Sequence, residues 1–107
     1  MKDENLDYAV DVWQEKVIIS LRGKLNLESV SFLRKDLTKA IDGNDRPLYE
    51  FDLSKLDYMD SSGVGLLLQL HKKLEAAGKA MAFTNVNDEI MHIFKVAGLE
   101  KILSISS

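Results

Sequence analysis

The stretch that best indicates the fold is Phe51-Asp52-Leu53-Ser54-Lys55-Leu56-Asp57-Tyr58-Met59-Asp60-Ser61-Ser62-Gly63-Val64-Gly65-Leu66. Its start is rich in strand-forming residues, and with the residues just before it predicts a strand over 48–53. Residues 54–60 predict a connection that is anchored by two apolar side chains, Leu56 and Tyr58.

A helix is expected after this connection. It should begin at Ser61 or Ser62 and end at Gly78, because apolar residues recur between these points at helical spacing. The residues expected on its apolar face are Val64, Leu67, Leu68, His71 and Leu74. A strand followed by a helix is the repeating unit of α/β proteins.

The residues before this stretch predict a hairpin and a first helix. Residues 6–12 alternate in polarity, and residues 17–21 are mostly β-branched. Gly23 follows and is expected to end the second strand, so the two segments should pair as a hairpin. The period then changes to that of a helix, with Asn26 as the expected N-cap and Gly43 at the end.

The residues after the stretch predict a strand at 79–84, a helix capped by Asn87 and ended by Gly98, and a strand at 102–105. The inner face of that helix should consist of Ile90, Phe94 and Ala97. The predicted order is β-β-α-β-α-β-α-β. We therefore expect an α/β fold in one domain over 1–107, with helices packed on a mostly parallel sheet and an antiparallel N-terminal strand.

Composition excludes several classes of function. The chain has 107 residues, no cysteine, two histidines and a net charge of -3. The missing cysteines rule out disulfides, Cys-zinc sites and cysteine nucleophiles, and the lack of basic surplus argues against nucleic-acid binding. No apolar run approaches the ~20 residues of a membrane span and no signal-like segment is visible, so we expect a soluble, cytoplasmic protein with no membrane insertion.

The unusual segment is residues 60–65, Asp-Ser-Ser-Gly-Val-Gly, at the expected start of the second helix. A phosphate on Ser61 or Ser62 would lie where backbone N–H groups and the helix dipole favour an anion. By spacing alone, the commoner explanation is that a serine is the N-cap and that the glycines permit close packing.

Nucleotide-binding and catalytic motifs do not match this segment. The third glycine of a dinucleotide loop is replaced by Leu68, and no Gly-Lys-Ser/Thr run occurs. Neither serine has the flanking glycines of a nucleophile elbow. A hydrolase using Ser61 or Ser62 with His71 or His92 is therefore the weakest alternative.

Metal and cofactor binding are not expected. Asp52, Asp57 and Asp60 could form only a loose carboxylate group, and we expect a solvated loop with no metal ion. Trp13, at a strand end, is expected in the core or at the sheet edge.

The segment from Phe51 to Leu66 resembles the signature of the STAS domain, the sulfate-transporter and anti-sigma-factor-antagonist family. Two further segments share the likeness, which extends over nearly the whole chain. Leu21-Arg22-Gly23-Lys24-Leu25 resembles the family's glycine-containing strand end, and the run from Phe94 to Ile102 resembles its closing helix-to-strand segment.

The resemblance implies a binding module and not an enzyme. In the antagonist branch, the module binds an anti-sigma factor that is also a serine kinase, and binding frees a sigma factor. The kinase phosphorylates the first serine after the aspartate, here Ser61 and less plausibly Ser62, which releases the module. A PP2C-type serine phosphatase reverses the reaction. No cofactor is implied, and a monomer or weak dimer is expected.

The expected partner-binding surface consists of Asn26, Asp60, Ser61, Ser62, Gly63 and Val64. This chain departs from the family at Lys24 and Asn26, where acidic residues are common, so its surface is less acidic. A second interpretation keeps the fold but makes the chain an accessory or scaffold subunit of a transporter or signalling complex, without a phospho-switch.

Overall fold

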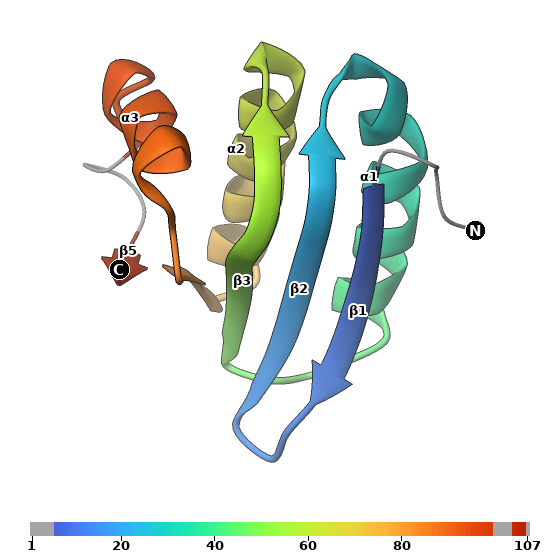
Figure 1. Cartoon of the computed structure of the whole chain (residues 1–107). Coiled ribbons are helices and arrows are strands. Elements are labelled where there is room, and N and C mark those ends of the chain that lie inside the picture. The colour runs from blue at the N-terminus through green and yellow to red at the C-terminus, as the bar shows by residue number, and fades with distance from the viewer. Residues whose placement is uncertain (1–5, 100–103, 107) are drawn as a thin grey trace.

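The computed structural model describes residues 6–99 and 104–106. In this part of the chain it contains five strands and three helices in the predicted order (Figure 1). Their bounds are β1 Leu6–Val12, β2 Lys16–Leu25, α1 Leu27–Asp42, β3 Leu48–Met59, α2 Ser61–Ala76, β4 Ala80–Thr84, α3 Asp88–Val96 and β5 Ser104–Ser106. Among the helices described, none has an apolar stretch of the length that a membrane span requires.

The five strands form a single sheet in the order β1-β2-β3-β4-β5. β1 runs antiparallel to β2, and the other neighbouring strands are parallel, as predicted. Figure 1 shows α1 and α2 behind β1, β2 and β3, so one face of these strands is covered by helices and the other is open. The mostly parallel α/β arrangement with an N-terminal antiparallel strand is confirmed.

The core lies between the sheet and the helices. Alternate residues of β3, Tyr49, Phe51 and Leu53, are fully buried, whereas the residues between them face the open side. The ring of Phe83 in β4 lies 5.6 Å from that of Phe51 and 5.1 Å from that of Phe94 in α3. Aromatic packing thereby joins α3 to the centre of the sheet.

Two strands are longer than the sequence predicts. Gly23 does not end β2, which continues to Leu25, and β3 continues through the predicted connection to Met59. The parallel pairing of β2 with β3 shifts register on both sides of Gly23, whose φ is +102°. A glycine in this conformation lets a strand absorb an irregularity and resume pairing.

Several side chains lie elsewhere than expected. Tyr58 is 48% exposed and does not anchor a connection, although Leu56 is buried as predicted. Trp13 is 51% exposed directly after the edge strand β1, so it lies at the sheet edge and not in the core. Ala97 is exposed beyond the inner face of α3. The buried face of α2 includes Leu66 and Leu70, which the predicted face omitted. Of the predicted last strand, residues 102 and 103 lie outside the described residues.

Candidate functional site

Asp60 connects the starts of two helices. Its Oδ1 atom accepts hydrogen bonds from the backbone N–H groups of Ser62 at 2.9 Å and Gly63 at 3.2 Å, so Asp60 is the N-cap of α2. Its Oδ2 atom accepts from the N–H of Leu27, the first residue of α1, at 3.2 Å. The prediction that a serine caps α2 is therefore wrong. A carboxylate suits this position because it satisfies several free N–H groups at once.

The start of α1 has its own cap. The side chain of Asn26 accepts from the N–H of Ser29 at 3.1 Å, while the Ser29 hydroxyl accepts from the N–H of Asn26 at 3.0 Å. Ser29 is fully buried, and its hydroxyl also donates to the carbonyl oxygen of Lys24 at 3.0 Å. The predicted N-cap at Asn26 is confirmed, and this reciprocal cap holds the turn next to Asp60.

Gly63 allows α2 to approach the end of β2. A Cβ atom there would lie 2.6 Å from Met59 Cγ and 2.9 Å from both the Cγ and the carbonyl oxygen of Leu25. At Gly65 an added Cβ would meet nothing within 4 Å. The expectation that the glycines permit close packing therefore holds for Gly63 and not for Gly65.

Ser61 is the first residue of α2 and is exposed, whereas Ser62 is half-buried. Ser61 borders a groove with a volume of about 370 Å³ between the start of α2 and α3. The lining residues, which we call the serine groove, are Met59, Asp60, Ser61, Val64, His92, Ile93, Val96 and Ala97. Val96 on the rim is 75% exposed and adds apolar surface at the edge of the groove.

The structure brings the predicted site residues together at the carboxyl ends of β2 and β3, where α1 and α2 begin (Figure 1). Asn26 and Val64 are half-buried, and Gly63 is buried, so Gly63 can act on this surface only through packing. The α3 side of the groove was not predicted. Val96 could have indicated it, since this apolar residue lies off the buried stripe formed by Ile90 and Phe94.

Among the described residues, the site shows no arrangement of side chains that is typical of a catalytic centre. His71 lies ten residues into α2 from Ser61, a distance of about 15 Å along a helix. His92 borders the same groove as Ser61, but no hydrogen bond joins a histidine to either serine hydroxyl among residues 6–99. The same residues contain no group of three His, Asp or Glu side chains that could hold a metal ion.

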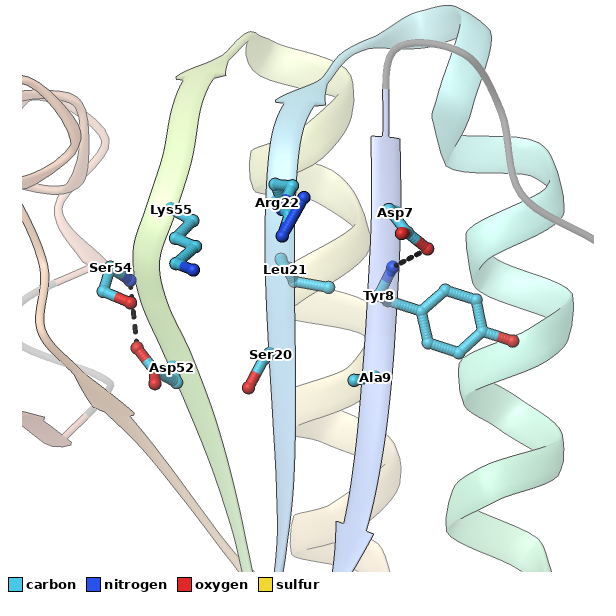
Figure 2. Close-up of a pocket in the computed structure, with 9 residues that line it drawn as sticks. All are labelled: Asp7, Tyr8, Ala9, Ser20, Leu21, Arg22, Asp52, Ser54 and Lys55. Carbon is cyan, nitrogen blue, oxygen red and sulfur yellow. Dashed lines mark hydrogen bonds between the residues drawn. The ribbon is translucent and has the colours of Figure 1, made fainter.

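A second hollow, of about 320 Å³, lies on the open face of the sheet (Figure 2). Its charged side chains are Asp7, Arg22, Asp52 and Lys55. Burial of Asp52 opposes its ionisation, but the N–H of Ser54 and the amide of Asn85 donate to Oδ1 and hold the pKa of Asp52 below its usual value. Charges of both signs within one hollow favour neither an anion nor a cation, so this hollow is a weaker candidate than the serine groove.

Comparisons with known proteins identify the family of this chain. A family model described as the STAS domain matches residues 8–107. An anti-sigma F factor antagonist from Paenibacillus polymyxa is 29% identical over 101 residues, which cover 94% of this chain and 86% of that protein.

Two solved structures of SpoIIAA are also similar. The anti-sigma factor antagonist in its unphosphorylated form is 27% identical, with a TM-score of 0.79 over 94% of this chain and 89% of that one. The phosphorylated form of the Bacillus cell fate determinant is 27% identical, with a TM-score of 0.72 over 94% of this chain and 92% of that one. The family match spans almost the full length, and the chain therefore belongs to the STAS domain family.

Proposed function

We propose that this chain is an anti-sigma factor antagonist, a binding module of one domain over residues 1–107 that is switched by phosphorylation of Ser61. One observation carries the proposal: an exposed serine hydroxyl lies at the first position of α2, on the edge of a largely apolar groove. The similar proteins named as antagonists, and the solved phosphorylated form of one of them, support it. Binding, and not catalysis, is the activity.

The partner is an anti-sigma factor that is also a serine kinase. It covers Ser61, Ser62 and Asp60 and inserts apolar side chains into the serine groove beside Val64. Asn26 and Gly63 contribute to this surface by fixing the starts of α1 and α2. Val96 and Leu27 are 75% and 72% exposed, and burying them supplies apolar contact area on both sides of Ser61.

Phosphorylation weakens this interface by charge and desolvation. A phosphate adds roughly -1.5 to -2 charge at pH 7. Asp60 directly precedes Ser61 and carries a negative carboxylate, so the partner would have to bury two neighbouring negative groups. A penalty of about 3 kcal/mol lowers affinity more than a hundredfold. No large rearrangement of the module is needed.

The remaining parts of the switch follow from this mechanism. A PP2C-type phosphatase removes the phosphate from Ser61 and restores binding. A kinase partner that uses ATP places the module in the cytoplasm. We expect the module to act as a monomer or weak dimer.

The experiment combines intact-mass analysis with binding measurements. Incubation with the cognate kinase and ATP should add one phosphate to the parent and to Ser62→Ala, and none to Ser61→Ala. Ser61→Ala should bind the kinase as the parent does, and Ser61→Asp should bind more than tenfold more weakly. Equal binding by all variants, with no phosphate on the parent, would contradict the switch and favour an accessory or scaffold role.

A further inference from the structure

The serine groove contains one side chain that can carry positive charge. Its other lining residues are apolar except for Asp60 and Ser61. His92 is an exposed residue of α3 and borders the groove opposite the start of α2. A group attached to Ser61 and extending into this groove therefore meets one possible cation among the lining residues.

Three of the backbone donors near Ser61 are already occupied by Asp60. Asp60 Oδ1 holds the N–H groups of Ser62 and Gly63, and its Oδ2 holds that of Leu27. A phosphate on Ser61 could take these donors only by displacing the cap that joins the two helices. The groove, with His92 across it, is accessible without that cost.

We propose that the imidazolium of His92 pairs with a phosphate on Ser61 and stabilises the phosphorylated module in a pH-dependent way. This inference rests on the proposed modification of Ser61 and adds a residue that responds to it. Pairing would favour the charged forms of both groups. The pKa of His92 would therefore rise on phosphorylation, and the second pKa of the phosphate would be lower than in the absence of His92.

Imidazole and phosphoserine side chains in general change charge between about pH 5 and 8, the range over which pairing can be followed. Other charges near His92 are Asp88, Glu89 and Lys95, each within about one turn of α3, and Asp60 across the groove. Asp57 of β3, which packs against α3, shares a hollow with Asp88 and Glu89. α2 contributes no further titratable group to the lining. These charges are the same in the unphosphorylated and phosphorylated protein, so a difference in the pKa of His92 between the two would be caused by the phosphate.

The test needs no kinase, so it is independent of whether the proposed partner acts on this chain. Phosphoserine is incorporated at position 61 during ribosomal synthesis, and the imidazole C–H resonances are followed by proton NMR from pH 5 to 9. The chain has only His71 and His92, which are assigned with His71→Gln and His92→Gln. We expect the pKa of His92 to rise by about 0.5 or more, a threefold change in its acid constant, and that of His71 to stay constant.

A second measurement separates pairing from a general field effect. In phosphorus NMR titrations, His92→Gln should raise the second pKa of the phosphate. His92→Lys, which supplies a positive charge at neutral pH, should restore a low second pKa. His71→Gln should have no effect on it. An unchanged pKa of His92 in protein whose phosphorus spectrum confirms the phosphate would overturn the pairing. Failure of the kinase to modify Ser61 would instead contradict the proposed function.

Discussion

Asp60 Oδ2 accepts a hydrogen bond from the backbone N–H of Leu27 at 3.2 Å, across 33 positions of sequence. The other oxygen of the same carboxylate caps α2. One side chain thereby holds the first turns of α1 and α2 next to each other at the carboxyl ends of their preceding strands. Ser61 takes its position from this arrangement, since it directly follows Asp60.

The first prediction concerns this shared cap. Asp60→Ala removes the acceptor of three backbone N–H groups, so we expect a loss of about 1–3 kcal/mol in the free energy of unfolding. Urea denaturation measures the loss. Asp57→Ala is the matched control, because Asp57 is exposed in the same segment and should change stability by less than about 0.5 kcal/mol. Equal losses of stability for the two substitutions would show that the hydrogen bonds of Asp60 do not stabilise the fold.

The second prediction compares two glycines of α2. Gly63→Ala places a methyl group against Met59 and Leu25 and should destabilise the fold by about 1–3 kcal/mol. Gly65→Ala enters open space within the same helix and should stabilise it by about 0.5–1 kcal/mol. Opposite signs in thermal or urea denaturation are expected, and a stable Gly63→Ala variant would contradict the close approach.

The third prediction is a pH dependence of stability. The Tyr8 hydroxyl donates to Asp36 Oδ2 at 2.7 Å, and this hydrogen bond, helped by burial, raises the pKa of Tyr8 to about 12. The folded protein therefore retains this proton more strongly than the unfolded chain. The stabilisation should be constant up to pH 10 and should disappear as the pH rises toward 12.

The acid side has the opposite sign. The hydrogen bond from Tyr8 lowers the pKa of Asp36, so its contribution is present above the usual aspartate pKa and is lost as the pH falls through the lowered value. Tyr8→Phe removes both effects and should lower the urea midpoint at neutral pH. The difference between the urea midpoints of parent and variant, measured from pH 2 to 12, should shrink toward both extremes, and a constant difference would argue against the pairing.

The fourth prediction concerns the rim of the serine groove. Val96 is exposed, so Val96→Asp should leave the fold intact while placing a charge where the kinase partner is expected to bind. We expect binding to weaken about tenfold or more, as for an apolar residue within an interface core. Val12→Asp is the control, since Val12 is 45% exposed on β1, away from the groove. Calorimetric titration with the partner should distinguish them.

Local signals in the sequence predicted most of the fold. Helical spacing with Asn26 and Asn87 as caps located α1 and α3, and both caps are present in the structure. The extension of β3 to Met59 was missed because its alternation breaks down there: Leu56 and Met59 are both buried, but they are three residues apart. Pairing with β2, and not intrinsic preference, keeps this segment extended.

The site was predicted in part. Ser61 at the start of α2 followed from the helical period that begins there, but the sequence favoured a serine cap over Asp60. Both residue types are good caps, and only the hydrogen bonds of the folded chain distinguish them. His92 and Val96 were not assigned to the site because the groove that joins them to Ser61 is formed by segments about 30 residues apart.

Residue type and short-range period were enough to predict the order of the elements, the segment that carries the site and the family resemblance. Three features became visible only in the folded chain: Asp60 joins two helices, Gly63 and not Gly65 needs to lack a side chain, and His92 shares a groove with Ser61. The difference lies in how far apart in the sequence the interacting residues are. Caps and periods act within one or two turns, whereas a shared carboxylate, a close approach and a groove exist only after distant segments have packed together.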